Sequence, residues 1–131
     1  MSIPPTELQR PTDAELEILT VLWSLGASTV REVHETILKR KPAQYTTVLK
    51  MLQIMTEKGL VMRDDAERAH RYSASKPREW TQKQLAGDLL QRAFAGSASS
   101  LMLGALSAKK ASKKEMAELR QLLAQWEGGS R

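Results

Sequence analysis

The chain has 131 residues, of which 41% are hydrophobic and only 5% aromatic, and its formal net charge is +5. It has no cysteine, so disulfides and thiolate metal sites are excluded, and its two histidines, His34 and His70, are too few for a zinc or copper site. The first residues lack the basic-then-apolar order of a signal peptide, and no apolar run approaches the ~20 residues that span a bilayer. We therefore expect a cytoplasmic protein with no metal, no cofactor and no membrane insertion.

Two short helical patterns follow an irregular start. Residues 1–11 contain three prolines and no periodicity, which predicts a flexible arm. Thr12 begins the first helix with a capping box, and Gly26 ends it. Thr29 begins the second helix in the same way, and Pro42 is expected to end it. The expected apolar side of this second helix consists of Val30, Val33, Ile37 and Leu38.

A third helix is predicted from Tyr45 to Lys58, with Gly59 in the usual position past a helix end. Its apolar side is expected to consist of Tyr45, Val48, Leu52 and Met55. The opposite side carries the polar residues Thr46, Thr47, Lys50, Gln53 and Glu57. A helix of this kind needs only one side to hold on to a core, so the other side is free to bind a partner.

Two short strand patterns come next and predict a β-hairpin, although no glycine lies between them. The strands cover residues 60–63 and 71–74. Helical patterns occupy the remainder of the chain, over residues 77–95, 99–107 and 112–126. The order predicts a mainly α fold with a small β-wing, that is, a winged helix-turn-helix followed by a helical region.

We expect three segments of the chain to have different roles. Residues 1–11 are the flexible arm, residues 12–75 are the winged-helix DNA-binding domain, and residues 76–131 are a helical dimerisation domain. Residues 1–75 carry ten Lys or Arg against ten Asp or Glu, whereas residues 76–131 carry ten against five. Bulk charge therefore does not single out the winged helix as the DNA-binding part, but a one-sided arrangement of its charges would still bind phosphate.

The polar side of the third helix and the hairpin arginines are the candidate contacts to double-stranded DNA. Thr, Lys and Gln side chains reach phosphates and base edges, and hairpin arginines suit phosphates beside the groove. The candidate DNA-binding residues are Gln44, Tyr45, Thr46, Thr47, Lys50, Gln53, Arg63, Arg68 and Arg71. An ordinary solvent-facing helix and a solvated turn remain the alternatives. The run Lys39-Arg40-Lys41 is more typical of a helix C-terminus than of a nucleic-acid patch.

The helices after residue 76 carry apolar residues that little else in the chain can cover, which favours helix pairing between two chains. The expected dimerisation residues are Leu101, Leu103, Leu106, Met116, Leu119, Leu123 and Trp126. Neither a Gly-rich phosphate loop nor a Ser-His-Asp arrangement nor a carboxylate pair with a helical partner is present, so we expect no enzymatic activity.

Several segments, in order and at matching spacing, are similar to one known family. They are Glu15-Leu16-Glu17-Ile18-Leu19 with Leu22-Trp23, Thr46-Thr47-Val48, Lys58-Gly59-Leu60-Val61, Arg71-Tyr72-Ser73-Ala74, Phe94-Ala95-Gly96-Ser97 and Glu115-Met116-Ala117-Glu118-Leu119. From Thr12 to Trp126 the chain thus resembles the BlaI/MecI/CopY family of penicillinase-type repressors. Two departures are visible: Ile54 stands where the family commonly has Arg, and the cysteine cluster of the copper-responsive branch is absent, which argues against metal induction.

The resemblance implies a homodimeric repressor on a pseudo-palindromic operator, with one winged helix on each half-site. In that family a membrane sensor with a metalloprotease domain leads to cleavage of the repressor in its dimerisation region. The resemblance places this point near Ser100 and Leu101, although the Asn-Phe pair of relatives is replaced here. We expect residues 96–101 to join two helices and to open locally. The alternative function is a winged-helix protein-interaction module without sequence-specific DNA binding.

Overall fold

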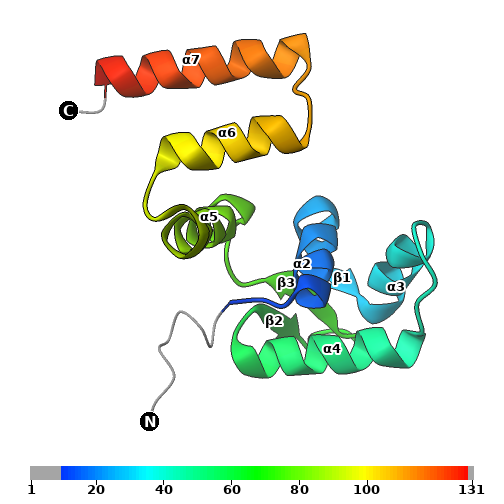
Figure 1. Ribbon diagram of the computed structural model, residues 1–131. Helices are drawn as coiled ribbons and strands as arrows, with labels where there is room; N and C mark the ends of the chain where they lie inside the picture. Colours follow the sequence, from blue (N-terminus) through cyan, green and yellow to red (C-terminus); the bar gives the residue numbers. More distant parts are fainter. Residues whose placement is uncertain (1–9, 130–131) are drawn as a thin grey trace. The chain divides into compact units, whose positions relative to one another are not determined.

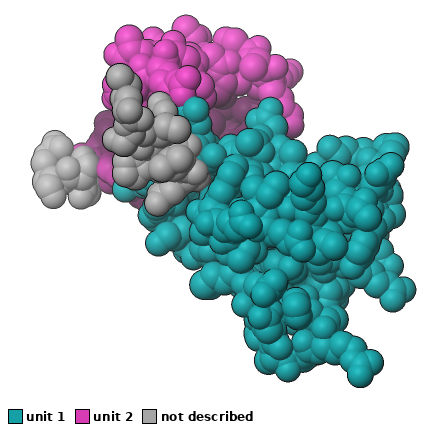
Figure 2. Space-filling model, turned by 90° about the horizontal axis from the view of Figure 1, so that it is seen from below, with its two compact units in different colours: residues 1–85 teal, residues 86–131 magenta. Residues whose placement is uncertain are grey.

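The structure is a computed structural model that describes residues 10–129. Most of the predicted flexible arm, residues 1–11, therefore lies outside the described residues. The chain divides into two compact units, which Figure 2 colours as residues 1–85 and 86–131. The boundary falls inside one helix, α5 (Arg78–Phe94). The functional division after residue 75 stays a prediction.

Two capped helices begin the first unit, α2 (Asp13–Leu25) and α3 (Val30–Leu38), as Figure 1 shows. At the start of each, the N-cap threonine hydroxyl accepts a hydrogen bond from a backbone N–H three residues on. The glutamate at that position accepts one from the N–H of the threonine. The two pairs are Thr12 with Glu15 and Thr29 with Glu32. Both predicted capping boxes are confirmed, so local sequence alone fixes where these helices begin.

The second helix ends before the proline that was expected to end it. The backbone N–H groups of Arg40 and Lys41 both donate to the carbonyl of Ile37, which closes the helix at Leu38. The prediction that Pro42 ends this helix is therefore wrong. The prediction that Leu38 lies on the apolar side is also wrong, because this last helical residue is 46% exposed. The other three residues predicted for that side are buried.

The third predicted helix is α4 (Tyr45–Lys58), which lies along the lower edge of the first unit in Figure 1. Gly59 follows it in the left-handed conformation, with φ of 81°, as predicted. Tyr45 is 45% exposed, so its predicted place on the buried side is wrong: it is the first helical residue and lies beyond the edge of the core. The buried residues predicted for the middle of the helix are confirmed: Val48, Leu52 and Met55.

The hairpin belongs to a three-stranded antiparallel sheet with the order β1-β3-β2. Strands β2 (Val61–Asp64) and β3 (Arg71–Ala74) form the predicted hairpin. The third strand, β1 (Ser28–Thr29), pairs with the other edge of β3, with Ser28 opposite Tyr72. Sequence periodicity did not predict β1, because two residues between helices show no alternation. The strand ties the start of α3 to the wing.

One hydrophobic core holds this unit together, and α2, α3, α4 and the sheet all contribute to it. Its buried residues are Ile18, Leu19, Val21, Leu22, Val30, Val33, Ile37, Val48, Leu52, Met55, Val61 and Tyr72. Because α4 contributes only three of them, about one side of that helix is occupied. The fold is a winged helix-turn-helix with a mainly helical remainder, as predicted.

An ion pair between a buried carboxylate and a partly exposed lysine joins the start of α2 to the end of α4. Glu15 is only 4% exposed, and its Oε2 lies 2.8 Å from Lys58 Nζ. Its Oε1 accepts the backbone N–H of Thr12 at 2.9 Å. Burial alone would raise the pKa of Glu15, but the hydrogen bonds from Lys58 and Thr12 and the Lys58 charge hold this pKa below its ordinary value. The carboxylate is thus charged, buried and hydrogen-bonded through both oxygens.

The start of α5 is attached to α2 through tryptophan contacts. Trp23 Nε1 donates to the carbonyl of Lys76 at 3.0 Å, and the Arg78 guanidinium lies 6.0 Å from the centre of the Trp23 ring. The Lys76 ammonium lies 5.2 Å from the centre of the Trp80 ring. Cation–π attraction at this distance is modest but directional. The first turn of α5 therefore belongs to the winged-helix unit.

The second unit contains the end of α5 with α6 (Ala98–Ala108) and α7 (Lys113–Gly129). Among residues 86–128, none is buried. The Phe94 ring packs against α6 at Gly104, where a Cβ would lie 3.4 Å from the ring. The described part of this unit therefore has helices but no buried core of its own.

The connection between α5 and α6 is shorter than expected. Gly96 has φ of 80° and ends α5, and the Ser97 hydroxyl caps α6 by accepting the backbone N–H of Ser100 at 3.1 Å. Ser100 and Leu101 thus lie in the first turn of α6. The expectation that residues 96–101 form the joining segment is wrong, because only three residues separate the two helices.

Replacing Glu15 by Gln should lower the free energy of unfolding at neutral pH by ~1–3 kcal/mol, because the partly buried Lys58 ammonium would have no charged partner. The folded-state pKa of Glu15 lies below its ordinary value of 4.5. Its contribution is therefore present above pH 4.5 and disappears as the pH falls through the folded-state pKa. The free energy of unfolding can be measured by urea unfolding at several pH values and fixed protein concentration. The values for wild type and variant should converge as the pH becomes acidic. The control is Glu57→Gln, which removes an exposed carboxylate next to Lys58 on α4. An equal effect there would contradict the assignment.

Candidate nucleic-acid interface

The outer side of α4 is a polar surface that the core does not cover. Every candidate on this helix, together with the residue that precedes it, is exposed: Gln44, Tyr45, Thr46, Thr47, Lys50 and Gln53. Ile54 is exposed on the same helix and offers apolar atoms. The structure thus leaves each predicted residue of α4 exposed to solvent; Figure 1 shows where this helix lies in the first unit.

The N-terminus of α4 has backbone donors available for an anion. Gln44 occupies the N-cap without making a side-chain cap hydrogen bond, and the first turn contains no acidic residue. The first N–H groups of a helix have no partner within the helix and carry partial positive charge. This end of α4 therefore has the chemistry that binds a phosphate oxygen.

His34 positions the start of α4 and was not predicted to have any role. Its Nε2 lies 2.8 Å from the carbonyl of Ala43, and its ring meets the Tyr45 ring edge-on with centroids 5.7 Å apart. His34 lies four residues after buried Val30, on the inward side of α3. That spacing is the signal that could have indicated a structural role. The contact fastens the turn between the two helices.

Most cations of this unit are already paired with carboxylates. Of the nine Lys and Arg residues from 11 to 75, six make ion pairs with distances from 2.7 to 3.5 Å. The six are Arg31, Arg40, Lys41, Lys58, Arg63 and Arg71. Within the described residues, the three cations of this range without a carboxylate partner are Lys39, Lys50 and Arg68. Sequence patterns could not separate these groups, because pairing depends on tertiary distances.

The three wing arginines differ in what they contact. Arg63 pairs with Asp65, whereas Arg71 pairs with Glu32 at 3.2 Å and lies 3.8 Å from Glu67. Arg71 therefore attaches β3 to the capped start of α3. The hydrogen bond from the Thr29 backbone, with the Arg71 charge, holds the pKa of Glu32 below its ordinary value. Arg68 has no such partner among the described residues and is the wing arginine most available to a phosphate.

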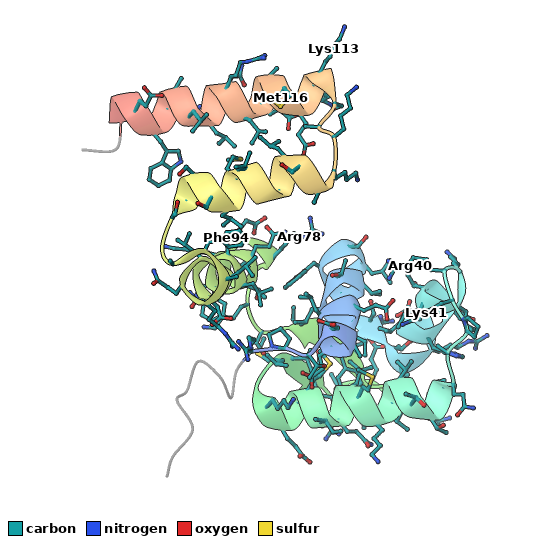
Figure 3. The ribbon with its side chains drawn as sticks, viewed as in Figure 1. Arg40, Lys41, Arg78, Phe94, Lys113 and Met116 are labelled. Atoms are coloured by element: carbon teal, nitrogen blue, oxygen red, sulfur yellow. The ribbon has the colours of Figure 1, made fainter. Side chains whose placement is uncertain are left out.

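Two of the three basic residues after α3, the run Lys39-Arg40-Lys41, also pair with a carboxylate. Arg40 and Lys41, labelled in Figure 3, both approach Glu17 of α2, at 3.5 and 2.8 Å. These contacts fasten the turn after α3 to α2. They do not test the interpretation of this run as a helix C-terminus, because the run follows Leu38 and the last turn of α3 contains no basic residue. Lys39 is the member without a carboxylate partner in the described part of the chain.

The described residues offer neither a metal site nor a membrane span. Residues 10–129 contain no group of three or more His, Cys, Asp or Glu side chains placed to hold a metal ion. Over the same residues, no helix has the length and apolar character needed to cross a membrane.

The model of the penicillinase repressor family matches residues 11–125. The chain belongs to this family. Penicillinase repressors are regulators, so membership confirms that the chain is not an enzyme. Curated relatives are similar over part of the chain: "Transcriptional regulator BlaI" from two strains of Mycobacterium tuberculosis, CDC 1551 / Oshkosh and ATCC 25618 / H37Rv, is 41% identical over 68 residues. That region is 51% of this chain and 49% of each relative, so the chain spans about half the length of the curated relatives it matches.

Solved structures are similar to this penicillinase repressor family member in fold. A MarR family protein from Bacillus stearothermophilus is 19% identical, with a TM-score of 0.52, over 95% of this chain and 80% of that one. The solution structure of the monomeric form of BlaI from Bacillus licheniformis, in complex with the blaP half-operator, is 24% identical with a TM-score of 0.47. It covers 60% of this chain and 89% of that one. The first of these shares the winged-helix fold.

Proposed function

We propose that this chain is a DNA-binding transcriptional repressor that acts as a homodimer on a pseudo-palindromic operator. The observation that carries the proposal is the outer side of α4, a polar, exposed surface on a helix that the core holds by one side, in a chain of the penicillinase repressor family. Recognition helices of winged helix-turn-helix proteins present such a surface to the major groove. Localisation in the cytoplasm, where the DNA is, belongs to the same proposal.

In this proposal the helix reads sequence and the wing positions the protein. Thr46, Thr47 and Gln53 have hydroxyl or amide groups for base edges, and Gln44 lies at the end that approaches the groove first. Lys50 and Arg68 have no carboxylate partner among the described residues and suit phosphates, which supply affinity but no sequence information. Arg63 and Arg71 contribute less, because carboxylates already hold them.

Homodimerisation is proposed from the second unit. Three of the seven predicted residues, Leu101, Met116 and Leu119, are only half-buried. The others are exposed, with Leu103 at 68% and Trp126 at 69%. A run of helices with this much exposed apolar surface and no buried residue between 86 and 128 gains stability when a second copy covers it. The apolar residues of α7 are spaced three, four and three positions apart, as in helices that pair with one another. They are Met116, Leu119, Leu123 and Trp126.

Relief of repression through proteolysis is proposed at the same unit. Ser100 is exposed in the first turn of α6, next to the short connection that ends at Ser97. Helix ends fray more readily than helix middles, so a protease could reach this turn after local opening. A cut there would remove α6 and α7 from the winged helix. The membrane sensor and protease pathway implied by the resemblance is the proposed source of the signal.

Thr47→Ala and Gln44→Ala should reduce discrimination between operator and random DNA, costing ~1–3 kcal/mol for each hydrogen bond to a base that the variant cannot make. Arg68→Ala should weaken binding to both DNAs about equally, because a phosphate contact carries no sequence information. Fluorescence anisotropy titrations at several salt concentrations measure both effects. For wild type the log affinity should fall as log salt rises. The slope should reach roughly 5 in magnitude for a dimer in which each winged helix has three cations without a carboxylate partner among the described residues.

The control in this experiment is Thr20→Ala, a threonine change on α2 outside the proposed surface. A flat salt response of the wild type would favour the protein-interaction module instead. If Arg68→Ala changed specificity while the helix variants did not, the roles assigned to helix and wing would be exchanged.

Truncation after Gly96 removes α6 and α7 and should give a monomer whose winged helix still folds. Operator affinity should fall by roughly 100-fold or more, because two tethered half-site contacts become one. Sedimentation velocity measures the assembly, circular dichroism the folding, and anisotropy the binding. Leu103→Ser with Trp126→Ser in the full chain is the matched test of the exposed apolar surface. A dimer that survives truncation would place the interface elsewhere.

If proteolysis lifts repression, mass spectrometry of protein recovered from induced cells should give N-terminal fragments that end near Ser100. Replacing Ser99 and Ser100 by Pro should remove that fragment, since it changes both the sequence and the first turn of α6. Uninduced cells are the control. Full-length protein that persists through derepression would refute cleavage as the signal.

A further inference from the structure

The wing has as many carboxylates as arginines. Between Val61 and Ala74 the chain contains three arginines and, in addition, Asp64, Asp65 and Glu67, so the hairpin has no net charge from these groups. A wing selected only for affinity to a polyanion would not need acidic residues at its tip. Their contacts indicate what they do.

Asp65 holds Arg63 through both of its oxygens. Arg63 Nε lies 2.7 Å from Asp65 Oδ1, and Arg63 Nη2 donates to Asp65 Oδ2 at 3.2 Å. This is the two-pronged geometry with which a guanidinium also binds phosphate. The Nε–H and one Nη2–H of Arg63 are therefore already in use. His70 Nδ1 lies 3.6 Å from Asp65 Oδ1, the same oxygen that faces Arg63 Nε.

Asp64 and Glu32 have structural tasks that Asp65 and Glu67 lack. Asp64 Oδ1 accepts the backbone N–H of Ala66 and shapes the turn, and Glu32 completes the capping box of α3. The Glu67 carboxylate only approaches Arg71, at 3.8 Å, and is largely exposed. Exposed pairs of this kind contribute little to folding stability. The fold therefore does not account for Glu67, and the contacts that the structure gives Asp65 are to Arg63 and His70 of the hairpin itself.

We propose that Asp65, with a smaller contribution from Glu67, is a specificity-determining residue that restrains the wing arginines. Asp65 occupies Arg63 and repels nearby phosphates. It thereby limits the binding affinity that contacts between the wing and the phosphates of any DNA sequence can supply. Non-specific binding depends almost wholly on such phosphate contacts, whereas operator binding also includes base contacts from α4. The restraint therefore weakens non-specific binding more than operator binding. The inference rests on the proposed function.

The test uses full-length protein and two duplexes of equal length and composition: a genomic fragment selected by binding to the wild type, and its shuffled sequence. Asp65→Asn should tighten binding to the shuffled duplex by about fivefold for each bound winged helix at low salt, the effect of removing one charge near a phosphate. The salt slope of the dimer should become steeper by roughly 1.8, the value for one more neutralised phosphate on each of its two winged helices. The ratio of operator to shuffled affinity should fall. Glu67→Gln should change all three quantities in the same direction by less.

Glu35→Gln is the matched control, because Glu35 also pairs with an exposed arginine, Arg31, at 3.4 Å, and its removal changes net charge equally. Adding Arg63→Gln to Asp65→Asn should abolish the gain, which shows whether Arg63 carries it. Equal effects of Asp65→Asn and Glu35→Gln, or a gain that survives Arg63→Gln, would overturn the inference while leaving DNA binding intact. Wild-type protein that binds neither duplex with a salt dependence would overturn the proposed function, and this inference with it.

Discussion

Val48, Leu52 and Met55 attach α4 to the core through one side, and the position of every proposed DNA contact on that helix depends on this attachment. Two further contacts fix its ends. The contact of His34 with the carbonyl of Ala43 lies before the first turn of α4, and the ion pair of buried Glu15 with Lys58 lies at its last turn. Helix propensity alone would leave both ends free to fray. The three attachments together hold an otherwise solvent-facing helix in one orientation.

Ion pairs of the winged helix join its helices and its wing to one another. Glu17 fastens the turn after α3 to α2, and Glu32 joins the wing to α3. Such pairs use up cations that a polyanion would otherwise attract. Residues 1–75 of the chain contain ten basic and ten acidic residues, so the winged helix has few cations left for phosphate. The DNA affinity of such a winged helix should depend more on contacts with base edges than the affinity of a strongly basic winged helix does.

Features encoded by neighbouring residues could be predicted from the sequence, and features created by tertiary distance could not. The capping boxes at Thr12 and Thr29 and the glycine stop at Gly59 are local, so α2 and α3 begin, and α4 ends, where the sequence indicates. The end of α3 at Leu38, before Pro42, was not indicated in this way. Periodicity identified the buried middle of α4. By contrast, β1 exists only because β3 lies beside it, and Leu38 and Tyr45 are exposed because both lie at helix ends beyond the core. The candidate residues on α4 do lie on exposed surface. Sequence could not reveal that Arg63 and Arg71 pair with carboxylates, whereas Arg68 has no such partner within residues 10–129.

The division of the molecule into a folded head and a coreless helical unit has a consequence for regulation. The head buries its own apolar residues, so it does not need the second unit in order to stay folded, whereas α6 and α7 expose theirs. If two chains associate through those helices, as proposed, the connection between heads can be removed without unfolding either head. A single head with few unpaired cations would then have weak affinity for DNA of any sequence. A strongly basic winged helix would stay bound to DNA after the two copies had separated. Release from DNA by separation of the dimer, as proposed, therefore also needs a winged helix with almost no net charge.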